Sequence, residues 1–174
     1  LMGLVFFAAL ICCIFVPFER IHRLFPAPVL ARIPLLTLSS IKVTYDPNFD
    51  PKRVSVFTQN HISMLDGHLA CASIPGVFCG LENAAHFLIP MYGWLMKLGN
   101  GIPVPSKSTE GRAEMLKDAF LNRAERQISV LTFPEGHRTL DGRVKAYRRG
   151  AFFMAREAGL PVAPICVRGC YNVL

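Results

Sequence analysis

The sequence predicts an α/β domain in which a mostly parallel sheet is covered by helices. Short apolar segments alternate with helical ones between residues 54 and 167, a pattern typical of parallel strands joined by helical crossovers. The apolar run ISVLTF, residues 128–133, is the clearest of the predicted strands. A chain of 174 residues is long enough to bury the core of one such domain.

The elements of this domain are expected in a regular order. Apolar segments that suit buried strands lie at residues 54–58, 77–80, 101–104, 128–133 and 161–167. Helical spacing and helix-start or helix-stop residues predict helices at 63–73, 108–127 (with Ser108 or Thr109 as N-cap) and 147–159 (ended by Gly159). The apolar stretch 86–98 has two interpretations, a core helix or a segment at a membrane interface.

An N-terminal membrane-associated helical segment is expected to precede the domain. Residues 1–18 carry no charge, and this length is at the lower limit for a bilayer-spanning helix; the alternative is a buried core helix. Residues 1–40 are therefore predicted to be a transmembrane or interfacial segment, and 41–174 the globular domain. The basic residues that follow favour a cytoplasmic position for that domain: Arg20, Arg23, Arg32 and Lys42, against Glu19 alone.

The C-terminal end of the sequence leaves two expectations open. The chain stops at Leu174, just past the predicted strand 161–167. Either a sheet strand ends the domain or the C-terminus is truncated.

The charge is uneven and suits an anionic partner. The net charge is +7, and most of it falls in the second half, where residues 88–174 hold 13 Lys or Arg against 7 Asp or Glu. Lipid phosphate or a phosphorylated substrate fits such a surface. Nucleic acid is the weakest candidate because no nucleic-acid-binding module is recognisable.

The six cysteines predict neither disulfides nor a metal site. None of them forms a CxxC pair, and we expect them to be reduced and buried as small apolar residues. No metal or redox cofactor is expected.

The stretch TQNHISMLDG, residues 58–67, supports two interpretations of one aspartate. Ser63 and Asp66 match a capping box, with Ser63 as N-cap and Asp66 in the first helical turn. Alternatively, His61 lies at the turn between strand and helix, where its ring can fold back onto Asp66. Asp66 would then orient His61 as a general base. The spacing alone is weak evidence.

A second stretch, FPEGHRTLDGR at residues 133–143, presents charged groups after another predicted strand. Pro134 and Gly136 shape a turn that carries Glu135 and Arg138. Five basic residues and one acid lie between positions 138 and 149. This segment is interpreted either as a solvated loop that docks on anionic lipid or as a phosphate site with Arg138 as its fork-shaped donor.

Together these stretches resemble the lysophosphatidic acid acyltransferase family, the 1-acylglycerol-3-phosphate acyltransferases of the glycerolipid acyltransferase group. The motifs that carry the resemblance occur in the family's order between about residues 41 and 169: Asn60-His61 with Asp66, Phe133-Pro134-Glu135-Gly136-His137-Arg138, Arg149-Gly150 and Leu160-Pro161-Val162-Ala163-Pro164. The set as a whole is specific. The resemblance implies that residues 41–174 form an acyltransferase domain.

One motif departs from the family pattern. An arginine that helps to hold the acceptor's phosphate is expected after Gly101, and Ser106 stands in its place with Lys107 beside it. Either Lys107 takes this role as a point charge, or the acceptor differs from lysophosphatidic acid.

The resemblance implies transfer of an acyl group from acyl-CoA or acyl-carrier protein to a lysophospholipid hydroxyl at a membrane. His61 would be the base and Asp66 its partner; substrate binding would fall to Glu135, Gly136, Arg138, Lys107 and Ser106, with Glu135 either positioning the acceptor or ordering the loop. The alternatives are an acyltransferase for another lysolipid, for example lyso-ornithine lipid, and a non-catalytic lipid-binding protein of the same fold. The partners are the bilayer, the lysophospholipid and the acyl donor, without nucleic acid.

Overall fold

The computed structural model describes Ile11, residues 41–106 and residues 110–171. The expectations for the segment 1–40, for Lys107 and for an N-cap at Ser108 or Thr109 lie outside these residues. Within the described ranges, no helix combines the length and the apolar character needed to cross a membrane.

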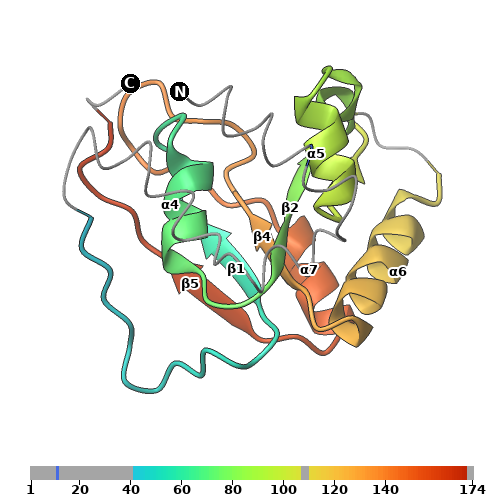
Figure 1. The fold of residues 1–174 in the computed structure, drawn as a ribbon, viewed down its shortest axis with the longest axis horizontal. Coiled ribbons are helices and arrows are strands. Elements are labelled where there is room, and N and C mark those ends of the chain that lie inside the picture. Colours follow the sequence, from blue (N-terminus) through green and yellow to red (C-terminus); the bar gives the residue numbers. More distant parts are fainter. Residues whose placement is uncertain (1–10, 12–40, 107–109, 172–174) are drawn as a thin grey trace.

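A five-stranded parallel sheet forms the centre of the domain (Figure 1), which confirms the predicted fold class. Every strand pairing is parallel, and the strand order is β3-β2-β4-β1-β5. The strands are β1 (Val56–Gln59), β2 (Phe78–Asn83), β3 (Ile102–Val104), β4 (Ser129–Thr132) and β5 (Val162–Ile165). All four residues of β1 and of β4 are buried because helices cover both faces of the sheet there.

The helices begin later than the sequence pattern predicts. They are α4 (Asp66–Ser73), α5 (Tyr92–Leu98), α6 (Arg112–Glu125) and α7 (Gly150–Glu157), with a 3-10 helix η1 (Ala84–Leu88) before α5. α4 starts three residues after the predicted cap, and α6 starts after Gly111, whose φ of +76° is outside the helical region. The apolar stretch 86–98 is divided between η1 and α5 instead of forming one helix.

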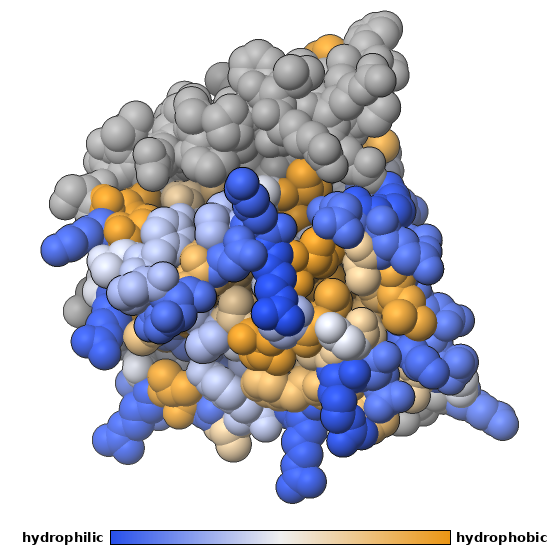
Figure 2. All heavy atoms as spheres, turned by 90° about the horizontal axis from the view of Figure 1, so that it is seen from below, coloured by the Kyte–Doolittle hydropathy of each residue, from blue (hydrophilic) through white to orange (hydrophobic). Residues whose placement is uncertain are grey.

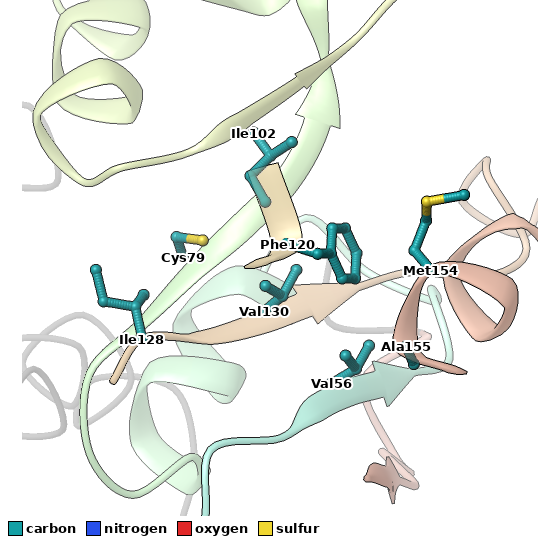
Figure 3. Close-up of a cluster of buried hydrophobic side chains, with 8 residues drawn as sticks. All are labelled: Val56, Cys79, Ile102, Phe120, Ile128, Val130, Met154 and Ala155. Atoms are coloured by element: carbon teal, nitrogen blue, oxygen red, sulfur yellow. The ribbon is translucent and has the colours of Figure 1, made fainter. Parts of the chain in front are cut away.

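Two apolar clusters fix the helices on opposite faces of the sheet. Phe120 of α6 and Met154 of α7 pack on strand residues of one face, including Val56 and Val130 (Figure 3). On the other face, Ala70 of α4 packs against a cluster of Phe57, Ile74, Phe78 and Leu131. Neighbouring strand residues such as Val56 and Phe57 face opposite clusters, as the two-residue period of a strand requires.

Because all strands are parallel, their carboxyl ends meet at one edge of the sheet. The loop after β1 carries His61, the loop after β4 carries Glu135, and the end of β2 carries Glu82. The fold therefore brings together two sequence motifs that are 74 residues apart, as measured by the bond between His61 and Glu135.

The cysteines only partly follow the expectation of burial. The four that the structure describes are free, but Cys79 alone is buried; Cys71 and Cys170 are partly buried and Cys166 is exposed. Burial raises the pKa of Cys71 and of Cys79 to about 11. Cys166 lies just past the end of the edge strand β5, whose alternating exposure leaves it no cover.

Replacement of Phe120 by alanine is expected to lower the free energy of unfolding by about 3–5 kcal/mol, because it leaves a cavity under α6. Phe120 is fully buried between this helix and the sheet. Urea denaturation followed by circular dichroism measures the change. Met115→Ala on the same helix is the matched control, since Met115 is exposed; a Phe120→Ala loss no larger than that of the control would contradict this account of the core.

Candidate active site

His61 and Asp66 form a hydrogen-bonded pair at the carboxyl end of β1. The His61 Nδ1 atom lies 2.7 Å from Asp66 Oδ2. The same oxygen accepts the backbone N–H groups of Ile62 at 2.7 Å and Ser63 at 3.0 Å. Asp66 is fully buried, whereas 27% of the His61 side chain is exposed. The strand-to-helix turn therefore wraps around one carboxylate oxygen and presents the imidazole at the surface.

This geometry fixes the tautomer of His61. An ionised carboxylate only accepts hydrogen bonds, and two backbone donors already require Asp66 Oδ2 to act as the acceptor. Nδ1 must then carry the proton and donate it to Asp66, which leaves Nε2 of the neutral ring with its lone pair. Among the residues that the structure describes, Nε2 has no hydrogen-bond partner.

A single oxygen of Asp66, Oδ2, both binds the backbone of the turn before α4 and orients His61. Ser63 does not cap the helix as predicted: its Oγ accepts from Leu65 N at 3.2 Å, and the residue that precedes α4 is Leu65. The return half of the capping box is present in the bond from Ser63 N to Asp66 Oδ2. Within the described part of the chain, Asp66 Oδ1 is buried without a partner.

Asn60 holds the end of β1 in place. Its Nδ2 donates to Val167 O at 2.9 Å and its Oδ1 accepts from Val167 N at 2.7 Å. The amide thus imitates one more backbone pairing between β1 and β5.

The ring of Phe133 stacks on His61 at a centroid distance of 4.3 Å and an angle of 21°. Sequence analysis gave these contacts no role because they join residues far apart in the chain.

Glu135 is buried and binds backbone groups of two loops. Its Oε1 accepts from His61 N at 2.7 Å, and its Oε2 accepts from Lys145 N at 2.8 Å. A further bond, from Thr139 N to His61 O at 2.9 Å, closes the same junction. Of the two roles predicted for Glu135, this position favours ordering the loops over contact with an acceptor.

Gly136 is favoured by its backbone conformation, and a neighbouring guanidinium packs closely against it. Its φ is +76°, and a Cβ atom there would lie 2.6 Å from the Cζ atom of Arg148. Arg148 in turn donates its backbone N–H to Pro134 O at 2.8 Å. Arg148 is therefore a cation of the site that the sequence analysis did not single out, because it was counted only as one of a basic run.

Arg138 follows Gly136 in the same turn and is partly buried. Among the described residues its guanidinium has no ion pair and no hydrogen bond. The structure thus leaves its donors available, as the predicted role in phosphate binding requires.

The structure describes only part of the motif in which Ser106 stands in place of the family's arginine. Ser106 Oγ donates to Asn83 Oδ1 at 3.1 Å, which joins the ends of β2 and β3. Lys107 lies outside the described residues. The Ser106 hydroxyl is thus engaged with a neighbouring side chain at the same edge as the histidine.

Three titratable groups near the site have shifted pKa values. Burial lowers the pKa of His68, which disfavours a charged ring there. Burial, followed by the charge of Asp66, raises the pKa of Cys170. The pKa of Tyr147 is raised by burial and then by the charges of Glu135 and Cys166.

Within residues 41–106 and 110–171, no three His, Cys, Asp or Glu side chains are grouped so that they could hold a metal ion. A shallow groove of about 430 Å³ runs along α7, lined by Tyr147, Arg149, Phe152, Phe153 and Arg156. Neither His61 nor Asp66 lines it, so it is separate from the pair.

The structure is an α/β domain with an oriented histidine at the carboxyl edge of a parallel sheet. A family model described as Acyltransferase matches residues 40–168. The chain belongs to this acyltransferase family, as its motifs predicted.

Relatives and a solved structure agree with this assignment. The chain is 28% identical over 162 residues to the chloroplastic 1-acyl-sn-glycerol-3-phosphate acyltransferase LPAT1 of Arabidopsis thaliana, covering 92% of this chain and 45% of that protein. A 1-acyl-sn-glycerol-3-phosphate acyltransferase of Chlamydomonas reinhardtii is 32% identical over 124 residues, covering 71% and 37%. The chain spans less than half the length of both relatives.

The fold is also that of the crystal structure of the 1-acyl-sn-glycerophosphate acyltransferase PlsC from Thermotoga maritima. The TM-score is 0.71 at 21% sequence identity, over 98% of this chain and 67% of that one. At this identity the match shows the fold.

Replacement of Glu135 by glutamine is expected to loosen the loop 137–146 and to cost about 1–3 kcal/mol of stability, because the amide nitrogen cannot accept a backbone N–H. Limited trypsin digestion measures the loosening, since Arg138, Arg143 and Lys145 are cleavage points in the loop. Faster cleavage than in the wild type is expected. Glu125→Gln is the matched control at an exposed acid of α6; equal cleavage of the two variants would refute the ordering role.

Proposed function

We propose that the chain transfers an acyl group from an acyl thioester, acyl-CoA or acyl-carrier protein, to a hydroxyl of a lysophospholipid, with lysophosphatidic acid as the first candidate. The observation that carries the proposal is the His61–Asp66 pair, with Nδ1 held at 2.7 Å from a buried carboxylate. The names of the relatives, 1-acyl-sn-glycerol-3-phosphate acyltransferases, support the choice of acceptor.

The chemistry follows from the position of the base. Nε2 of His61 takes the proton of the acceptor hydroxyl while its oxygen attacks the thioester carbonyl. A carbon–oxygen bond forms, and the tetrahedral intermediate collapses with cleavage of the carbon–sulfur bond. The leaving thiolate takes the proton back from the imidazolium. Asp66 stabilises the positive charge that the ring carries between the two proton transfers.

Cations around the turn after β4 suit an acidic head group. Arg138 has donors that no described carboxylate occupies, and Arg148 lies against Gly136 of the same turn. We assign the acid group of the acceptor to Arg138, with Lys107 as a second donor.

We further propose that the edge carrying the histidine faces the bilayer, with the domain on the cytoplasmic side. Apolar side chains in the loops and helices that follow β1, β2 and β4 are exposed: Met64, Leu88, Ile89, Trp94, Leu140 and Val144. The stretch 86–98 buries few of its side chains, so it suits an interface better than a core. Figure 2 shows that apolar surface also remains on another face of the molecule, surrounded by hydrophilic residues.

The single tryptophan provides a local test of this orientation. Trp94 is 52% exposed, and its emission is expected to shift to shorter wavelength when vesicles of phosphatidylcholine and phosphatidylglycerol are added. Leu88→Asp is expected to weaken vesicle binding about tenfold, because it removes a side chain that the bilayer would bury. Met115→Asp on α6 serves as control. No shift, or equal weakening by both substitutions, would exclude this edge as the bilayer contact.

Replacement of His61 by alanine is expected to lower acyl transfer from labelled acyl-CoA to lysophosphatidic acid in detergent micelles by roughly 10²–10⁴-fold, because the base is lost. The rate constant of transfer is measured for both proteins at saturating donor.

His137→Ala is the control for this experiment, since His137 is an exposed histidine to which no role is assigned. Activity unchanged in His61→Ala would remove His61 from the mechanism. No transfer by the wild type to any lysolipid would favour the alternative of a non-catalytic lipid-binding protein.

A different lysolipid acceptor is the second candidate within the same reaction. Ser106 stands where a phosphate-binding arginine is expected in the family, and its hydroxyl is engaged with Asn83. An uncharged pair at this position binds a phosphate less strongly than a guanidinium does.

A further inference from the structure

The end of β2 carries a carboxylate on the same face and edge of the sheet as His61. The pairing of Gly80 with Leu131, continued by two residues, places Glu82 beside Phe133. Phe133 packs with the α4-side cluster, and β2 residues alternate so that Glu82 points to this side as well. Neighbouring strands are about 4.8 Å apart. Phe133, which stacks on His61, follows β4, the strand that lies between those of His61 and Glu82.

Glu82 is held by two side chains but keeps accepting capacity. His86 Nδ1–H donates to its Oε1 at 2.6 Å, and Tyr92 Oη–H donates to its Oε2 at 3.3 Å. About a quarter of the Glu82 side chain (26%) is exposed. Each carboxylate oxygen has a second lone pair for another donor. Burial and then the charge of Glu82 raise the pKa of Tyr92 to about 12, so Tyr92 stays a hydrogen-bond donor.

Apart from His86, whose Nδ1 lies 2.6 Å from Glu82 Oε1, the sequence near Glu82 is poor in basic residues. Between residues 81 and 106 the sequence has Glu82 as its only acid, Lys97 as its only lysine and no arginine. Lys97 is in the last turn of α5 and exposed. Next to Glu82, Asn83 and Ser106 present an uncharged polar pair. The end of β2 and β3 thus offers a carboxylate and hydrogen-bond acceptors, which suit an ammonium group.

We propose that Glu82 determines acceptor specificity by binding an ammonium group of the acceptor's head group. Of the two acceptors proposed above, this selects the second, a lysolipid other than lysophosphatidic acid. It is zwitterionic, with its hydroxyl at His61, its acid group at Arg138 and its ammonium at Glu82. This inference rests on the proposed acyl transfer and names the substrate class. The order of the three contacts along the edge follows the strand order β1, β4, β2.

Acceptors that differ in one charge test the inference. Lysophosphatidylethanolamine and its N-acetyl derivative share the phosphate, the acyl chain and the acceptor hydroxyl, and only the first carries an ammonium. Lysophosphatidic acid completes the panel. We expect kcat/KM of the full chain for the ammonium form to exceed that for the N-acetyl form by about three- to tenfold, as for a partly exposed charge pair.

Glu82→Gln keeps the size of the side chain and one acceptor oxygen for His86 or Tyr92 but removes the charge, and is expected to reduce this ratio to about one. Glu114→Gln, an exposed acid in the first turn of α6, is the matched control and should keep the wild-type ratio. Thermal melting of both variants checks folding, and a ratio of rates from one preparation does not depend on the fraction that is folded.

Two outcomes separate this inference from the proposed function. Transfer to the panel without a preference for the ammonium form, or with a preference that survives Glu82→Gln, would overturn the role of Glu82 and leave the acyl transfer intact. Absence of transfer to every acceptor would overturn the proposed function and the inference with it. A purely structural role of Glu82 predicts equal losses on both forms, which the ratio excludes.

Discussion

The geometry of the site depends on a buried carboxylate, that of Glu135, which joins two loops at the edge of the sheet. Its two oxygens accept from His61 N and Lys145 N, so the end of β1 and the loop after β4 cannot move independently. Backbone N–H groups that are buried here need an acceptor, and leaving one unpaired costs about 1–3 kcal/mol. Other polar contacts of the site, including the bond from Thr139 N to His61 O, depend on these two loops being held together.

Asp66 adds a second constraint that acts on the imidazole itself. One oxygen receives two backbone N–H groups and the Nδ1–H group of His61, so turn geometry and ring orientation have one cause. The Nε2 atom of a freely rotating surface histidine would occupy many positions. The Nε2 atom of His61 has few, because the ring stacks on Phe133 and is bonded to Asp66. Such preorganisation is what a general base requires, because the proton transfer happens only within hydrogen-bonding distance.

The parallel α/β fold and the order of its elements could be predicted from the sequence, because buried strands and helical spacing are local patterns. It placed the start of α4 at Ser63, three residues early, since Asp66 uses its oxygen for the turn and not only for a cap. It also left Asn60 and Arg148 without roles. Asn60 bonds to Val167, 107 residues away, and Arg148 acts through its approach to Gly136; neither contact has a local signature. The exposure of Cys166 likewise depends on its place at a sheet edge.

The strands beside Ser106 give a physical reason for a serine where the family has a phosphate-binding arginine. A missing arginine alone is compatible with either a lysine substitute or another acceptor. The pairing of Glu82 with Pro103 and of Asn83 with Val104 brings an acid and an amide close to Ser106, two residues past the end of β3. A carboxylate there repels a phosphate and attracts an ammonium, and its effect is strengthened where the bilayer excludes water. In the proposed mechanism this edge combines the base His61, the acid-binding turn at Arg138 and the ammonium-binding Glu82, and a zwitterionic head group matches this order of charges.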